Sequence, residues 1–210
     1  MQKEIELTPE ELYYLGSFMQ AKYIDYAYVA AMSDIKQNYS LFENETKASL
    51  VSSGILMEDF SGQVEIDEET AGLLKPIFFG ETETSLDICS LGDENAVSVH
   101  KFHFYDGIIT MVTGNDGKLI IKSIDQVGIR TIVEGLLPDD YDVVSSIVTE
   151  VSEKTVTRFI AAKSIFIGKT SAVKTFLEAD GIFYQENEDY VESLSKEMFI
   201  NDIFNIVKGV

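Results

Sequence analysis

Few residues of this sequence have the types that carry out enzymatic chemistry. The chain has one cysteine, Cys89, and two histidines, His100 and His103. In a strand, residues three apart point to opposite faces, so the two histidines could not chelate one metal ion, and no cysteine pair lies nearby. A free cysteine is usually a buried small side chain, and nothing here positions an oxyanion hole beside it. We therefore expect neither a metal site nor a nucleophilic centre.

Two short motifs have the composition of ligand loops but not the spacing. Gly168-Lys169-Thr170 matches the end of a phosphate-binding loop, which also needs a glycine at position 163, where this chain has Lys163. Without that glycine the backbone cannot wrap the phosphates. Asn115-Asp116-Gly117 is too short for a calcium loop, whose ligands span twelve positions. The sequence therefore predicts a protein that is not an enzyme and has no cofactor.

The charge of the chain restricts its partners. The 210 residues include 36 acidic and 16 basic side chains, a net charge of −20. Such a field repels nucleic acids and anionic lipids, so we expect neither as a partner. The charge either keeps the protein soluble or attracts a basic or aggregation-prone partner. The first residues form no apolar signal segment, and no stretch reaches the ~20 apolar residues of a membrane span, which favours a cytoplasmic location.

The clearest helix signal stands near the N-terminus. Thr8-Pro9-Glu10-Glu11 combines an N-cap hydroxyl, a proline at the first helical position and a glutamate three residues after the cap. The following helix should bury Leu12, Leu15, Phe18 and Met19. Around it we expect an edge strand over 3–7, a helix or strand within 23–33, a helix over 44–53 ending at Gly54, a strand over 63–66, and a helix from Asp67 to near Pro76.

The centre of the chain predicts an antiparallel meander. Alternating strands over 84–91, 97–103, 108–113 and 119–124 are separated by turns at 92–95, 106–107 and 114–117. Asp-Gly between alternating runs is a strong hairpin signal. Val97, Val99, Lys101 and His103 should share one face of their strand.

The remaining residues predict a second part of mixed structure. Asp125 should cap a helix that runs to Leu137, and the acidic stretch 138–142 should be a hinge between subdomains 1–138 and 139–210 of a single α+β domain, 1–210. We expect one long strand or two strands over 155–167, a helix over 170–180, a strand over 182–184 and a final amphipathic helix from Asp189 that includes Leu194. Leu50 to Gly54-Ile55 and Leu177 to Gly181-Ile182 form a faint echo, through chance or an old duplication.

The order of these elements resembles a known family. Leu7-Thr8-Pro9-Glu10-Glu11-Leu12, the helix ending Leu50-Val51-Ser52-Ser53-Gly54-Ile55-Leu56, the segment from Val64 to Pro76, the meander and the close Leu136-Leu137-Pro138 are similar in order to EspG-type chaperones of type VII secretion and the EsaE-like proteins of low-GC Gram-positive bacteria. The resemblance implies a central antiparallel sheet flanked by helical bundles, with pseudo-twofold character.

The resemblance also implies a function. Such proteins are cytosolic and bind the tip of a helical-hairpin secretion substrate of the Trp-x-Gly, LXG or PE/PPE type, which they release at the export machine, so the secretion ATPase complex is a further expected partner. No contact motif can be transferred residue by residue. The region where substrate contact is expected is the turn and strand containing Gly92, Asp93, Glu94, Asn95, Val97 and Val99.

Two other functions stay open on the sequence alone. Short helices over 9–76 followed by hairpins fit a winged-helix-like regulator acting through protein or DNA, although Glu68-Glu69 gives its recognition helix the wrong charge for DNA. A small enzyme with a site built from scattered acids is the other, and the missing histidine, cysteine and glycine constellations count against it.

Overall fold

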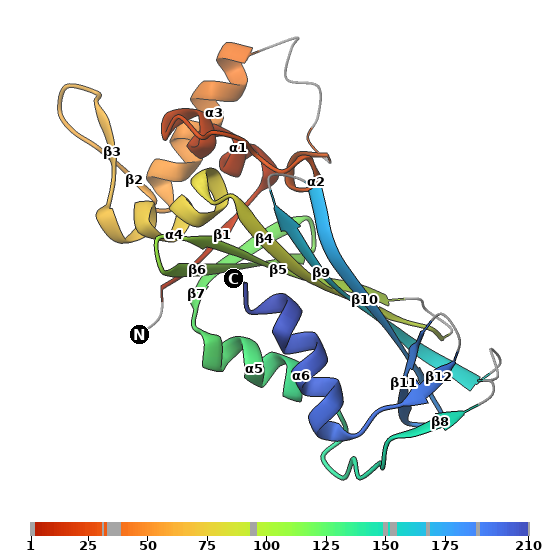
Figure 1. Ribbon diagram of the computed structural model, residues 1–210. Coiled ribbons are helices and arrows are strands. Elements are labelled where there is room, and N and C mark those ends of the chain that lie inside the picture. The colour runs from red at the N-terminus through yellow and green to blue at the C-terminus, as the bar shows by residue number, and fades with distance from the viewer. Residues whose placement is uncertain are drawn as a thin grey trace. The chain divides into compact units, whose positions relative to one another are not determined.

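The computed structural model describes residues 3–30, 32, 39–92, 96–148, 151, 155–166, 169–187 and 190–209. The chain forms two units that are interleaved in sequence. The first unit contains residues 1–80 and 103–123, and the second contains residues 81–102 and 124–210. Figure 1 shows the helices and strands of both.

The strands form a large antiparallel arrangement. In the first unit the strand order is β1-β7-β6-β5, and in the second it is β5-β4-β9-β10-β11-β12-β8, with β5 shared because it passes from one unit to the other. The strands are β1 (Glu4–Leu7), β4 (Thr82–Ser90), β5 (Ala96–Tyr105), β6 (Ile108–Asn115), β7 (Lys118–Ile124), β8 (Ser146–Val148), β9 (Val156–Phe166), β10 (Lys169–Ala179), β11 (Ile182–Glu186) and β12 (Val191–Ser193); β2 (Leu56–Glu58) and β3 (Val64–Ile66) form a separate hairpin.

The helices divide between the two units. The first unit contains α1 (Pro9–Phe18), α2 (Tyr26–Val29), α3 (Tyr39–Ser52) and α4 (Glu68–Phe79), and the second contains α5 (Gln126–Glu134) and α6 (Lys196–Val207). The α+β class and the large antiparallel sheet with helices are therefore confirmed. The hairpins belong to a large sheet, whereas a winged-helix domain has only a small wing. Within the described residues, no helix is both long enough and apolar enough to cross a membrane.

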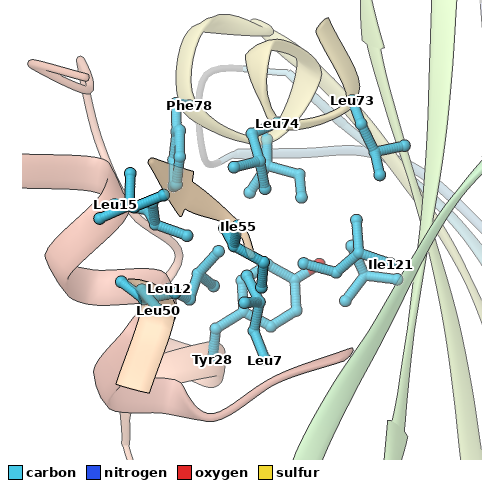
Figure 2. Close-up of a cluster of buried hydrophobic side chains, with 13 residues drawn as sticks. Leu7, Leu12, Leu15, Tyr28, Leu50, Ile55, Leu73, Leu74, Phe78 and Ile121 are labelled. Atoms are coloured by element: carbon cyan, nitrogen blue, oxygen red, sulfur yellow. The ribbon is translucent and has the colours of Figure 1, made fainter. Parts of the chain in front are cut away.

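The core of the first unit lies between its helices and its strands. Figure 2 shows buried leucines of α1 and α4 directed toward Ile121 of β7. Leu7, Leu12 and Leu15 are fully buried, so the edge strand and the first helix contribute to one core. The prediction that α1 buries Leu12 and Leu15 is confirmed, whereas Phe18, at the C-terminal end of the helix, is exposed.

The core of the second unit lies between α6 and the strands. The rings of Phe176 in β10 and Phe199 in α6 are 5.6 Å apart, and Phe183 in β11 lies 4.4 Å from Phe199. The hydroxyl of Thr84 in β4 donates to the carbonyl oxygen of Val207 at 2.8 Å. The contact between α5 and α6 completes this unit.

Several caps and turns that the sequence predicts are present in the structure. The capping box of Thr8 and Glu11 is present, with Thr8 N–H donating to the Glu11 carboxylate at 2.8 Å. Asp67 and Asp125 cap α4 and α5 as predicted. Helix α3 ends just before Gly54, which has a φ of +75°, a value that glycine adopts without strain. The hairpin turns at Asp106-Gly107 and Asp116-Gly117 have positive φ at both residues, as the primed turns require. The meander of β4 to β7 is confirmed.

The prediction of a helix over 170–180 is wrong, because this segment is strand β10. It pairs with β9 along most of its length, from Lys169 with Phe166 to Ala179 with Val156. Asp180-Gly181 forms a third turn with both φ values positive and joins β10 to β11. The segment contains β-branched residues, and pairing with β9 along its length and with β11 over Phe176–Ala179 overrides its moderate helix propensity.

Other helix boundaries also differ from the prediction. Helix α4 continues past Pro76 to Phe79, because Ile77 and Phe78 are buried in the core of the first unit. The last helix begins after Ser195, whose side chain accepts from Met198 N–H at 3.3 Å, and Leu194 precedes it. Asp189 lies outside the described residues. Helix α5 ends at Glu134 rather than Leu137, and α3 begins at Tyr39 rather than near 44.

The structure shows what lies at the predicted hinge, 138–142, and at the two similar strings that begin at Leu50 and Leu177. Tyr141, inside the acidic stretch, is buried, donates to the carbonyl oxygen of Leu194 at 2.7 Å and accepts from Phe183 N–H at 3.1 Å. The subdomain boundary at Pro138 stays a prediction. In the echo, Leu50 lies in a helix and Leu177 in a strand, so the two strings occupy different kinds of element.

Candidate partner-binding face

Strands β4, β9 and β10 form the centre of the second unit's sheet. The register pairs Cys89 with Phe159, Phe159 with Leu177, and Leu177 with Tyr184 of β11. Residues directly opposite each other in antiparallel strands have side chains on the same face. These four side chains therefore form one row across the sheet.

The two faces of this sheet have different environments. Leu86, Ile160, Ala162 and Phe176 are fully buried on the face that α6 covers. Because side chains alternate along a strand, the row of Phe159 lies on the other face. We call this the open face; its members are Asp87 and Cys89 of β4, Phe159, Ala161 and Lys163 of β9, Val173, Thr175 and Leu177 of β10, and Tyr184 of β11.

Apolar side chains on the open face are accessible. Phe159 is 38% exposed and Val173 is 51% exposed, although both lie in the middle of long strands. Exposed apolar side chains gathered on one sheet face are typical of a protein-interaction site. Figure 1 shows α6 on one side of β9 and β10, with α5 next to it.

The predicted contact residues Val97 and Val99 also belong to this face. Lys101 of β5 forms an ion pair of 2.9 Å with Glu83 of β4, so both side chains lie on the same side. Glu83 and Asp87 have the same parity in β4, and alternation then places Val97 and Val99 on the open face. Val97 is 68% exposed and Val99 is half-buried. We therefore include both valines in the open face.

The other predicted contact residues lie at the end of the β4–β5 hairpin. Gly92 is exposed and lies two residues after the end of β4, whereas Asp93, Glu94 and Asn95 lie outside the described residues. Their role in partner binding stays a prediction. Phe159 lies in a segment that was predicted as a strand, but its strand neighbours were not predicted. Val173 and Leu177 could not be predicted as members of the open face, because 170–180 was expected to be a helix. The Asp180-Gly181 turn was the available signal for a hairpin there.

Charges lie among the apolar side chains of the open face as pairs. Lys163 of β9 is hydrogen bonded to the Asp87 carboxylate of β4. On the other side of the sheet, the half-buried Arg158 of β9 donates to the Glu178 carboxylate of β10 at 2.7 Å and to the carbonyl oxygen of Leu136 at 2.9 Å. Burial raises the pKa of Tyr141, which joins β11 to the segment after β12. Side-chain hydrogen bonds therefore connect the strands that carry the open face to one another and to the segments behind them.

The possible catalytic groups do not come together. Cys89 is half-buried on the open face, and alternation places His100 on the opposite side of β5 from Lys101. His103 is buried in the first unit, with its Nε2 2.6 Å from the Tyr28 hydroxyl. Lys169 and Thr170 of the predicted loop motif begin β10. In the part of the chain that the structure describes, no group of three or more His, Cys, Asp and Glu side chains could hold a metal ion.

The α+β arrangement with its large antiparallel sheet is an EspG-like fold. A solved structure of the Mycobacterium tuberculosis chaperone EspG5, in complex with a PE25–PPE41 dimer, matches with a TM-score of 0.62. The match covers 98% of this chain and 95% of that chain at 9% sequence identity, so it shows a shared fold. No family model matches the sequence, and no curated protein matches it.

Proposed function

We propose that this protein is a cytosolic chaperone of a type VII secretion system, which binds the tip of a helical-hairpin substrate and keeps it soluble and competent for export. The shared fold with EspG5 over nearly the whole chain supports this function. The substrate class would be of the Trp-x-Gly, LXG or PE/PPE type, and the host a low-GC Gram-positive bacterium. Release would occur at the secretion ATPase complex.

The open face is the observation that carries the proposal. A helical tip exposes apolar side chains at intervals of three and four residues, and such a surface is covered best by a groove or sheet face with apolar anchors. Phe159 and Val97 are exposed on adjacent parts of the sheet, and the paired charges of Lys163 and Asp87 lie beside them. The partner would gain apolar burial without leaving an unpaired charge.

The acidic surface has a role in this function. A net charge of −20 keeps a complex dispersed through mutual repulsion, even while the chaperone holds an apolar substrate. The charge also disfavours membranes and nucleic acids as partners, so the complex would stay in the cytosol until it reaches the export machinery.

A capture experiment with matched variants tests this proposal. The tagged chain is used to isolate partners from its host at moderate salt, in parallel with Val97→Glu/Phe159→Glu and with the control Val127→Glu/Val144→Glu. The control changes two exposed valines away from the open face and adds the same charge. We expect a small helical secreted protein with the wild type and the control, and at least a tenfold loss with the open-face variant.

The captured substrate is then co-expressed with each variant. The wild type and the control should keep it in the soluble fraction, and the open-face variant should not. Equal capture by all three chains would show that the open face is not the binding site. Capture of no stoichiometric helical protein would contradict the chaperone function itself.

A further inference from the structure

The N-terminal part of β10 has a sheet partner on one side only. Strand β11 pairs with Phe176–Ala179, whereas β9 pairs with β10 from Lys169 onward. Among the described residues, no strand continues beside Lys169–Thr175 where β11 ends. Figure 1 shows β11 next to the lower part of β10 alone. A cleft at this step is lined by Val173, Lys174 and Thr175 on one side and by 185–187 on the other.

This unpaired edge belongs to the most basic segment of an acidic chain. Residues 154–177 contain five of the sixteen basic residues and no acidic residue. Lys169 is exposed and forms no ion pair with any described residue. Lys174 is half-buried and lies 3.0 Å from Asp202 of α6. The register, with its irregularity between Thr170 and Ala172, places both lysines on the face that α6 covers.

These features select which strand can add to the edge. Lysines and bulges on an edge strand work against pairing with a second copy, because like charges would meet and the edge is bent. They do not work against a strand that carries carboxylates on the matching face. Seven unpaired residues are enough for a short extended segment, since strands of five or six residues are common.

We propose that the β10 edge, Lys169–Thr175, binds an extended acidic segment of a partner protein by β-strand addition. Main-chain hydrogen bonds would give affinity, and carboxylates opposite Lys169 and Lys174 would give orientation. The site uses the main-chain edge of β10 and the lysines on the face that α6 covers, although Val173 and Thr175 also belong to the open face. The inference does not rest on the chaperone function.

Synthetic peptides test the binding mode on the unaltered protein. The probe is a labelled seven-residue peptide in which glutamate alternates with valine and threonine, and binding is measured by fluorescence anisotropy. We expect binding that weakens with salt, and at least tenfold weaker binding when lysine replaces glutamate. Two further peptides are N-methylated on alternate amides. One set of amides faces the edge and the other faces solvent, so one peptide should lose binding and the other keep it.

Protein variants then locate the site. Lys169→Glu/Lys174→Gln should lower affinity at least tenfold, and glutamine at 174 avoids a second carboxylate beside Asp202. The control Lys75→Glu/Lys196→Gln changes two exposed lysines and the net charge equally, and it should bind as the wild type does. Equal behaviour of the two N-methylated peptides would overturn strand addition. Equal displacement of the probe by a thymidine oligonucleotide would reveal a general anion site and overturn the proposal as well.

Discussion

Asp67 shows how one side chain links distant parts of the first unit. Its carboxylate accepts from the Thr70 hydroxyl and from Thr70 N–H at 3.0 Å, which caps α4, and it accepts from Lys3 Nζ at 2.9 Å. The hydrogen bonds from Thr70 are the main cause that lowers the pKa of Asp67 below its usual value, and Lys3 adds to the effect. The charged form therefore stabilises the start of α4 and the position of β1.

We predict that Asp67→Ala lowers the free energy of unfolding by about 1 kcal/mol at pH 7, as loss of an N-cap usually does. A carboxyl group whose pKa is lowered on folding contributes stability that is fully present above its unfolded pKa and is lost as pH falls toward its folded pKa. The difference between wild type and variant should therefore shrink below about pH 4.

Urea denaturation at pH 7 and pH 3 measures this difference. Asp106→Asn serves as the control, because asparagine tolerates the positive φ of that turn and no capping role is lost. A difference at pH 3 as large as that at pH 7 would show that the charge of Asp67 contributes nothing.

At the scale of the element, α4 has one glycine within it, Gly72, and one at its C-cap, Gly80, and their surroundings differ. A Cβ at Gly72 would meet no atom within 4 Å outside the helix backbone. A Cβ at Gly80 would lie 2.4 Å from the Pro76 carbonyl oxygen and 2.6 Å from that of Phe104. Gly80 is thus required where the helix ends against β5, and Gly72 only weakens the helix.

We predict opposite effects for alanine at the two positions. Gly72→Ala should raise the free energy of unfolding by about 0.5–1 kcal/mol through helix propensity. Gly80→Ala should lower it by 1 kcal/mol or more, on the order of an overpacked site, because backbone atoms must move. Guanidinium denaturation of both variants checks the signs, and a stabilising Gly80→Ala would contradict this close approach.

Elements set by neighbouring residues could be predicted from the sequence, whereas elements set by long-range strand pairing could not. Capping boxes and Asp-Gly turns act over a few residues, so α1, α4, α5 and the meander were predictable from their own residues. The open face depends on β4 pairing with β9, which joins Ser90 to Arg158, and no local pattern encodes that distance. The helix predicted over 170–180 failed for the same reason, since β9 and β11 decide its conformation.

At the scale of the whole molecule, the chain passes between the two units three times, after Gly80, Phe102 and Ser123. Strand β4 lies between β3 and β6 of the first unit in sequence but belongs to the second unit. A boundary at Pro138 would separate β4 from β9, although Thr82 to Ser90 pair with Phe166 to Arg158 along their full length.

A fragment of residues 139–210 tests that boundary. We predict that it does not fold, because β9 would lose β4 and α6 would lose Leu86 and Thr84 beneath it. Circular dichroism should show little strand signal and no cooperative melting. The control is the same fragment mixed with 1–138, which should recover structure if the pairing is specific. A cooperatively melting fragment would instead establish 139–210 as a subdomain.

The interleaving also sets an order of events on the ribosome. About 65 residues separate the end of β4 from the start of β9, which at roughly 5–20 residues per second takes about 3–13 s to synthesise. Throughout that interval the edge of β4 that pairs with β9 has no native neighbour. The chain is therefore open to aggregation through this strand edge while the rest of it is being made, and we expect its yield on synthesis to rise when general folding factors act early.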